Sequence, residues 1–487
     1  MLFNSYEFIF LFLPVTFLIF YQAAKRIGLR AAIFWLTLAS FLFYGWWDWR
    51  YVPLLFASIC FNYGVGRRIE ASPGGKGWLI GGITGNVLLL GFFKYTGFFL
   101  DTVNTVAGSH FSVPEIVLPL GISFFTFTQT AYLVDIYRRE TKNDTFLTYC
   151  EFVTIFPHLI AGPIINHKEM MPQFTAAKNY VLDYKNVAMG ICLFTMGLFK
   201  KVVIADSLSP WVANVFSRPE TLTFLEGWIG AVSYTFQLYF DFSGYSEMAL
   251  GLGLMFNLKL PVNFNSPYQA SNIIDFWRRW HMTLGLWVRD YLYIPLGGNR
   301  HGEFQKMRNL FVSMLIIGLW HGAGWTFVFW GGLHGVFLMI NHQWRRFHIT
   351  LPKACNWGLT FLCVVVCWVF FRAASVGDAL AVLASMTDIQ SFALPNGGFY
   401  EKQLGFLHGW GVSFIPWAMN ASLAKQIGWL TLLAAVVFFA PNPLQLMEKA
   451  TKQPRILQIM AGALGIVFAL TAVWLGQEAS EFLYFQF

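Results

Sequence analysis

The sequence predicts an all-α integral membrane protein, a polytopic bundle of about 11–13 helices with re-entrant segments. Hydrophobic residues make up 56% of the 487-residue chain and charged residues only 12%, about half the charge of an ordinary soluble protein. A soluble fold could not cover its surface with so few charges, whereas a bilayer removes that need. Aromatic residues reach 19%, with 52 Phe and 20 Trp, which suits lipid-facing surfaces and interfacial belts.

Apolar stretches of about 20 residues, the length that spans a bilayer, recur along the whole chain. In the first part they lie near 6–23, 31–48, 51–66, 77–100, 116–136 and 146–165. In the second part they lie near 184–204, 223–241, 243–257, 308–325, 326–343, 355–373, 425–442 and 456–476. Because several are short or interrupted by Gly and Pro, about a dozen spans is the better count.

Two stretches are expected to be re-entrant, namely Phe156-Pro157-His158 through Gly162-Pro163 and the region after Trp280. Broken backbone at membrane depth is tolerated only where it is buried in protein or lines a cavity. His158 is therefore either a cavity-lining residue or a structural one.

Charge bias between the spans predicts the orientation of the chain. Basic clusters follow the first, third and fifth spans and precede the last one: Lys25, Arg26 and Arg30; Arg67, Arg68 and Lys76; Arg138, Arg139 and Lys142; Lys449, Lys452 and Arg455. With these clusters in the cytoplasm, both termini and the stretch 376–424 lie outside. The net charge of +8 then belongs to cytoplasmic loops, and we expect no nucleic-acid partner, since no basic domain lies outside the membrane.

One basic segment differs from the others because aromatic residues are interleaved with its charges. It holds Arg278, Arg279, Arg289, Arg300, Lys306 and Arg308 among Trp277, Trp280, Trp287, Tyr291 and Tyr293. It is either an amphipathic interfacial helix or a basic mouth for an anionic cytoplasmic ligand, and the two readings are compatible.

Intramembrane ionisable residues are costly, so each is a functional candidate. The clearest is His321, which follows Trp320 and sits among glycines in Gly318 to Trp325. A neutral imidazole there can take a proton from a hydroxyl as a general base; the alternative is a histidine that hydrogen-bonds a neighbouring helix. His334 repeats this context between glycines and is more typical of a structural histidine.

Three further residues belong to the candidate set. His281 ends the run from Asp275 and is either functional or an interfacial histidine beside basic anchors. Asp241 and Glu247 are acids in an apolar stretch that could pair with Lys or Arg to hold the bundle. The sequence contains no P-loop, dinucleotide fingerprint, HExxH pattern or nucleophile elbow, so we expect no metal and no bound cofactor.

Five stretches together resemble the membrane-bound O-acyltransferase (MBOAT) family, in particular its bacterial branch of alginate O-acetylation and teichoic-acid D-alanyl transfer proteins. They are Leu118 to Phe127, Phe156 to Ile164, Tyr239 to Tyr245, Phe276 to Gly298 (FWRRWHMTLGLWVRDYLYIPLGG) and Gly318 to Gly335 (GLWHGAGWTFVFWGGLHG). The resemblance extends over the chain, which implies a single MBOAT-like transmembrane domain over residues 1–487 whose helices enclose a central funnel.

The resemblance implies roles for individual residues. His321 matches the catalytic histidine of the family and His281 the polar residue paired with it, while Trp320, Asp241, His158 and His334 are candidates for pocket or support. A cytoplasmic funnel in the family admits an acyl thioester. The donor is therefore expected to be acetyl-CoA, with Arg278, Arg279 and Arg289 as candidate contacts for its phosphates.

The C-terminus, Glu481 to Phe487, resembles the F-x-Y-x-x-F ending of bacterial O-acylation systems. The resemblance suggests that Tyr484 accepts the acyl group and relays it. The alternative is an aromatic interfacial anchor.

The resemblance thus implies an acetyltransferase of the bacterial inner membrane that serves an extracytoplasmic polysaccharide, alginate-like first. A separate extracytoplasmic acetyltransferase is the expected partner, because no soluble catalytic domain is visible. Alternatives within the family are D-alanyl or other acyl transfer to teichoic acid, peptidoglycan or cellulose, or acylation of a lipid. A transporter is the non-enzyme alternative, and it predicts inverted repeats that the sequence does not show.

Overall fold

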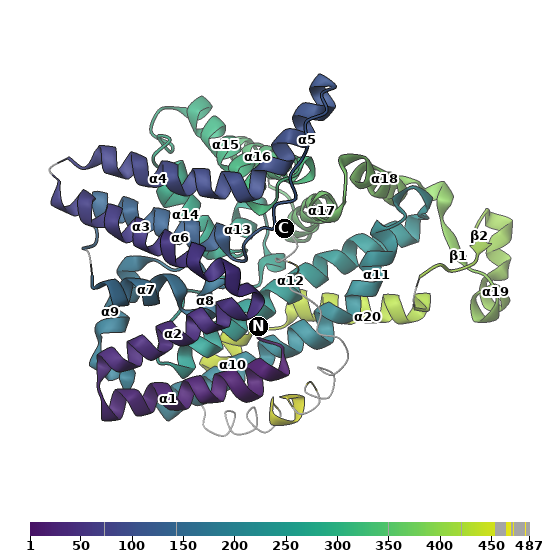
Figure 1. Cartoon of the computed structure of the whole chain (residues 1–487). Helices are drawn as coiled ribbons and strands as arrows, with labels where there is room; N and C mark the ends of the chain where they lie inside the picture. The colour runs from purple at the N-terminus through teal and green to yellow at the C-terminus, as the bar shows by residue number, and fades with distance from the viewer. Residues whose placement is uncertain are drawn as a thin grey trace.

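A computed structural model describes residues 1–72, 74–142, 144–348, 350–419, 421–452, 464–468, 471 and 483. Helices account for most of it (Figure 1). The elements up to the longest helix are η1 Glu7–Phe12, α1 Leu13–Arg26, α2 Leu29–Asp48, η2 Trp49–Tyr51, α3 Val52–Ala71, α4 Lys76–Leu90, η3 Gly91–Tyr95, α5 Thr96–Ala107, α6 Ile122–Tyr137, α7 Phe146–Thr154, α8 Phe156–Leu159, α9 His167–Thr175, η4 Ala177–Tyr180, α10 Tyr184–Phe199, η5 Lys200–Ala205, α11 Asp206–Phe216, η6 Pro219–Thr221 and α12 Phe224–Met255.

The remaining elements begin with short helices and turns and continue into a second set of long helices. They are η7 Pro267–Gln269, α13 Ile273–Trp277, α14 Met282–Val288, η8 Arg289–Tyr293, α15 Glu303–His321, α16 Trp325–Arg346, α17 Lys353–Arg372, α18 Val376–Thr387, η9 Ile389–Ser391, β1 Ala393–Pro395, α19 Gly398–Leu404, η10 Gly405–Trp410, β2 Ser413–Ile415, α20 Leu423–Phe439 and α21 Pro443–Thr451. Most of the last expected span, 456–476, lies outside the described residues.

Several helical stretches are built to cross a bilayer. Within the described ranges, five are long and apolar enough, and the bent pair α20 and α21 makes a sixth: Glu7–Arg26, Leu29–Ala71, Lys76–Ala107, Tyr184–Phe216, Lys353–Arg372, and Leu423–Phe439 with Pro443–Ala450. Other expected spans correspond to shorter or more polar helices such as α6, α15 and α16. The all-α, polytopic membrane fold that the composition predicts is confirmed.

The centre of the bundle is α12, whose 32 residues extend about 48 Å at 1.5 Å per residue. It packs against α10, α11, α17, α18 and α20 (Figure 1). The prediction of two spans, 223–241 and 243–257, was wrong, because Gly244 does not end this helix. A Cβ at Gly244 would lie 2.7 Å from the Gly197 carbonyl oxygen of α10, so the glycine permits close helix packing rather than a break.

The Pro/Gly-broken stretch before α9 is buried in protein. α7 ends at Thr154, the single turn α8 follows, and an irregular segment leads on to α9. His158 holds this segment: its Nδ1 lies 2.7 Å from the Pro163 carbonyl oxygen and its Nε2 lies 3.3 Å from the Thr128 hydroxyl. Since a carbonyl only accepts, Nδ1 carries the proton, and the imidazole supports the broken backbone.

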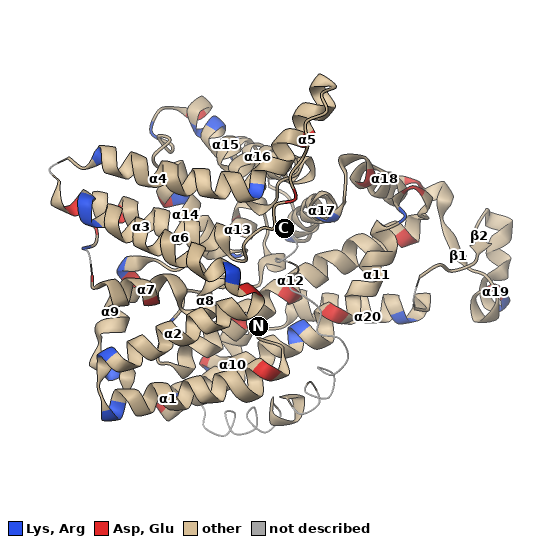
Figure 2. Ribbon diagram, in the orientation of Figure 1, with Lys and Arg blue, Asp and Glu red and all other residues tan. Residues whose placement is uncertain are grey.

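The two ends of the bundle differ in charge and in structure. Lys and Arg residues gather where α1 meets α2 and where α3 meets α4, on the left of Figure 2. The opposite end carries an arm formed by α19 and a two-stranded parallel sheet, in which Ala393 of β1 pairs with Ser413 of β2 (Figure 1). The arm falls inside the stretch 376–424 that charge bias places outside.

Candidate active site

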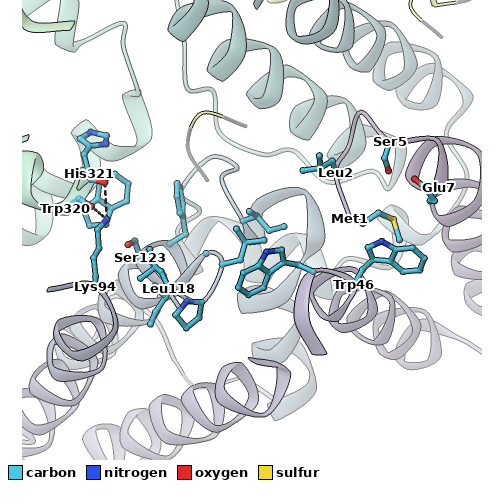
Figure 3. A pocket seen from close by; sticks show the side chains of 17 residues that line it. Met1, Leu2, Ser5, Glu7, Trp46, Lys94, Leu118, Ser123, Trp320 and His321 are labelled. Carbon is cyan, nitrogen blue, oxygen red and sulfur yellow. Dashed lines mark hydrogen bonds between the residues drawn. The ribbon is translucent and has the colours of Figure 1, made fainter. Parts of the chain in front are cut away.

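A cavity of about 440 Å³ opens beside the first residues of the chain. Its lining comes from the N-terminal segment, the end of α2, η3, the loop before α6 and the end of α15 (Figure 3). Trp320 and His321 belong to this lining, so we call it the His321 cavity. The N-terminal segment and the end of α15, which are far apart along the chain, therefore meet at His321.

His321 is the last residue of α15, and its local sequence explains its position. Gly322 has an extended backbone with φ −155°, which ends the helix and turns the chain toward α16. A Cβ at Gly331 of α16 would lie 3.2 Å from the Gly318 Cα, so these glycines let the two helices pack backbone against backbone. The glycines around the histidine thus form a tight helical hairpin that carries His321 at its tip.

Aromatic rings enclose the His321 imidazole on several sides. Its ring centroid lies 5.0 Å from that of Trp330, at 88°, and 5.3 Å from that of Phe371, at 75°. Trp320, the preceding residue, is 4.9 Å away. With 4% of its surface exposed, His321 is buried yet reaches the cavity, an arrangement that suits a base acting in a water-poor site.

His281 is completely buried and has an uncommon backbone conformation. Its φ of 43° lies in the left-handed region, which non-glycine residues seldom adopt and which often marks functional sites. Its ring centroid is 6.3 Å from that of Trp320 and 4.8 Å from that of Phe242. Both candidate histidines therefore pack around Trp320.

Asn263 fixes the His281 ring, a role the sequence analysis missed. Its Oδ1 lies 3.2 Å from His281 Nδ1 and accepts the Thr283 hydroxyl at 2.6 Å, while its backbone carbonyl accepts the Met282 N–H at 2.9 Å. Because the amide oxygen only accepts, His281 Nδ1 carries the proton. The sequence feature that could have indicated Asn263 was its polar side chain in a stretch between two prolines, Pro261 and Pro267.

A stack of three aromatic rings leads from the His321 cavity to a second cavity of about 210 Å³. Trp320 lines the first cavity and stacks on Phe127 at 5.0 Å; Phe127 stacks on Trp287 at 3.9 Å; and Trp287 lines the second cavity. The Trp287 indole N–H donates to the Phe127 carbonyl at 3.2 Å. This aromatic stack lies between the two cavities, and His281 and His321 lie beside Trp320 at one end of it.

The predicted phosphate-binding arginines occupy different positions. Arg289 lines the second cavity together with Lys168, and its guanidinium pairs with Asp290 at 2.7 Å. Arg279 pairs with Asp275 at 2.9 Å, and Arg278 is exposed. Of the three, only Arg289 lines one of the two cavities described above.

His334 and Asp241 lie in packed surroundings outside the lining of the His321 cavity. The Trp277 indole N–H donates to His334 Nδ1 at 3.3 Å, and the rings of Phe276, Trp330 and Trp368 surround the imidazole. Asp241 pairs with Lys201 of η5 at 2.9 Å, with both side chains 1% exposed. Glu247, the other acid of α12, pairs with Lys200.

Tyr484 lies outside the described residues, but its neighbour Leu483 is described. The Leu483 side chain is buried, and its backbone N–H donates to Asp241 Oδ2 at 3.2 Å. The Lys201–Asp241 pair therefore holds a residue of the C-terminal F-x-Y-x-x-F ending inside the bundle.

Comparison with known proteins identifies the family of this arrangement. Residues 136–386 match the model of MBOAT, the membrane-bound O-acyltransferase family. The peptidoglycan O-acetyltransferase of Helicobacter pylori is 48% identical over 428 residues, 81% of each chain. This chain belongs to the membrane-bound O-acyltransferase family. It is an O-acyltransferase and a multi-pass membrane protein.

Other MBOAT relatives differ in the acceptor that their names give. A probable alginate O-acetylase of Azotobacter vinelandii is 42% identical over 406 residues, covering 81% of this chain and 79% of the relative. A teichoic acid D-alanyltransferase of Streptococcus thermophilus is 28% identical over 246 residues, covering 48% and 59%. The resemblance that the motifs indicated is confirmed at the level of the family.

Proposed function

We propose that this MBOAT protein passes an acetyl group from cytoplasmic acetyl-CoA across the bacterial inner membrane for O-acetylation of an extracytoplasmic polysaccharide. One observation carries the proposal: His321 lies in a cavity on one side of the aromatic stack, and a second cavity opens on the other side. A donor and an acceptor can thus approach one buried centre from opposite faces.

Charge bias supports the direction of transfer. The second cavity is lined by Lys168 and Arg289 together with Glu169 and Asp290, and Arg138, which follows α6, donates to the Asp290 carbonyl at 3.1 Å. The His321 cavity is lined by the N-terminal Met1 and the end of α2, which the positive-inside rule places outside. The thioester would enter the second cavity, with Arg289 the leading candidate for a phosphate contact because its exposed pair with Asp290 is weak and exchangeable.

The chemistry requires one base and no redox step. His321 takes the proton of an attacking hydroxyl, whose oxygen forms a bond to the thioester carbonyl carbon. The C–S bond then breaks, and the leaving CoA thiolate receives the proton from the imidazolium. His281, fixed by Asn263, is assigned to orienting the reacting group beside Trp320.

Two acceptors are candidates for this chain. Alginate-type exopolysaccharide fits the sequence motifs and the 42% identical relative from Azotobacter vinelandii. Peptidoglycan is favoured by the higher identity, 48%, to the Helicobacter pylori protein. D-alanyl transfer to teichoic acid has weaker support, because that relative is 28% identical over 48% of this chain.

Tyr484 is proposed as an intermediate acceptor of the acetyl group. Support comes from the adjacent Leu483, whose amide donates to Asp241 inside the bundle. The tyrosyl ester would then pass its acetyl group to a separate extracytoplasmic acetyltransferase, which completes delivery to the polymer.

Deletion of the gene in its native host tests the function. Ester-linked acetate released by mild base is measured separately from purified peptidoglycan and from secreted polysaccharide, and we expect one of the two to lose its esters. Purified protein in proteoliposomes should also release CoA from acetyl-CoA. Unchanged acetate in both polymers, or no use of acetyl-CoA, would contradict the proposal.

The tyrosine relay needs its own measurement. Complementation with Tyr484→Phe is expected to leave protein levels unchanged and to abolish polymer acetylation, because the ring remains while the acceptor oxygen is removed. Undiminished acetylation in that strain would exclude the relay and leave Tyr484 as an interfacial anchor.

A further inference from the structure

The helix end that carries His321 leaves polar backbone groups to be satisfied. An α-helix leaves its last four carbonyls without intrahelical partners. In α15 the Gly322 N–H reaches the Gly318 carbonyl at 3.3 Å. The other three carbonyls belong to Leu319, Trp320 and His321 itself.

Side chains from η3 bind all three of these carbonyls. The Tyr95 hydroxyl donates to the Leu319 carbonyl at 2.7 Å. The Lys94 ammonium donates to the Trp320 carbonyl at 2.5 Å and to the His321 carbonyl at 3.0 Å (Figure 3). Two consecutive residues of a distant helix thus complete the end of α15, and we call them the α15 cap.

The position of Lys94 within a membrane-spanning segment explains why its ammonium binds these carbonyls. At membrane depth an unpaired carbonyl is costly, and a lysine side chain is itself costly there. η3 is a π-helical turn between α4 and α5, and such turns occur often at functional sites. A cation also complements the negative end of the helix dipole. Lys94 therefore satisfies a helix end and finds its own partners in the same contact.

We propose that Lys94 and Tyr95 fix the last turn of α15 and thereby set the position of the His321 imidazole in its cavity, with Lys94 as the principal positioning residue. The inference rests on the proposed catalytic role of His321. A terminal helical residue is held by few intrahelical bonds, and a displacement of about 1 Å at a reacting group can lower a rate about 100-fold.

Lys94 also lines the His321 cavity, so a direct action of its charge on the substrate is the competing account. The two accounts differ in what happens to the helix. Loss of the cap loosens the last turn of α15, whereas loss of a charge that acts on the substrate leaves the helix unchanged.

The test uses Lys94→Met, Lys94→Arg and Tyr95→Phe in the full-length protein in nanodiscs. Initial rates of CoA release from acetyl-CoA give kcat and KM, and hydrogen exchange of peptides covering residues 316–325 reports on the helix end. Tyr21→Phe is the matched control, because the Tyr21 hydroxyl donates at 2.8 Å to the carbonyl of Met255, the last residue of α12.

We expect Lys94→Met to lower kcat by about 100-fold and Tyr95→Phe by about 5-fold, each with KM for acetyl-CoA changed less than about twofold. Exchange in 316–325 should rise in both variants, and Lys94→Arg should recover most of the lost kcat. Tyr21→Phe should change neither kcat nor exchange in 316–325.

A normal kcat in Lys94→Met, or a lowered kcat with unchanged exchange in 316–325, would overturn the positioning role. If Lys94→Met does not fold, Tyr95→Phe alone decides by the same two readouts. Failure of the proposed function is recognised separately: the wild-type protein would then not use acetyl-CoA, or His321→Ala would retain activity, while hydrogen exchange would still report on the cap.

Discussion

At the scale of single residues, the two candidate histidines are held by different means. His321 stands at a helix end among aromatic rings, and the α15 cap binds the backbone around it. His281 is held through its ring, by the side chain of Asn263, in a left-handed backbone conformation. Backbone capping and a side-chain hydrogen bond thus fix two imidazoles around the shared Trp320.

Asn263→Ala tests the support of His281. The change removes the acceptor that fixes the ring and its proton on Nδ1, so we expect kcat for CoA release to fall by about tenfold or more with the fold retained. Asn62→Ala is the control, since Asn62 is equally buried and bonds Asn86 away from the cavity. Equal kcat losses in the two variants would mean that Asn263 acts only through stability.

The sequence predicted the residues that are unusual in their own segment and missed those defined by distant contacts. His321 and His281 are ionisable groups in apolar or aromatic stretches, which marks them without a structure. Lys94 is an exception: it is ionisable and lies in the expected span 77–100, so its charge could have marked it, although its contact with a carbonyl 226 positions away could not be predicted. Asn263 was missed because its role is defined by contacts with His281 and Thr283, which lie 18 and 20 positions away.

At the scale of elements, glycines decide how closely the central helices approach. Apolar stretches of spanning length predicted most of the long helices, but they divided 223–257 into two spans where one helix exists. The same residue type ends α15 at Gly322 and joins α12 to α10 at Gly244. Whether a glycine ends a helix or allows close packing depends on the residues that surround it in the fold, so the sequence alone could not distinguish the two effects.

Substitution of Gly244 tests this packing. Because an added Cβ would meet the Gly197 carbonyl oxygen at 2.7 Å, Gly244→Ala is expected to cost about 1–3 kcal/mol and to lower the Tm measured in detergent. Gly64→Ala on α3 is the matched control, since a Cβ there meets nothing within 4 Å, and alanine should stabilise that helix by about 0.5–1 kcal/mol. Effects of the same sign in the two variants would contradict the packing account.

At the scale of the whole molecule, the positions of the charges and cavities agree with the orientation that the positive-inside rule predicts, which stays a prediction. The His321 cavity opens near the N-terminus, and the second cavity is lined by Asp290, whose carbonyl accepts a hydrogen bond from Arg138 at the end of α6. The arm of β1, α19 and β2 stands at the end opposite the basic connections between α1 and α2 and between α3 and α4 (Figure 2). Composition predicted the polytopic helical bundle, whereas the aromatic stack between the cavities required the structure.

Cysteine labelling tests the orientation. Gln403→Cys, on the exposed face of α19, should react with a membrane-impermeant maleimide in intact spheroplasts, because the arm is assigned to the outside. The native Cys355, exposed at the start of α17, should react only after permeabilisation. The reverse pattern, mapped by peptide mass, would invert the topology and the proposed direction of acetyl transfer.

The central claim is that the His321 imidazole, reached from the cavity between the N-terminal segment and the end of α15, carries out acyl transfer. The most direct measurement compares CoA release from acetyl-CoA by purified wild-type protein, His321→Ala and the exposed-residue control His110→Ala. The account predicts a loss of at least about 1,000-fold for His321→Ala, with an unchanged Tm and a fully active control. Retained activity in a folded His321→Ala protein would contradict it.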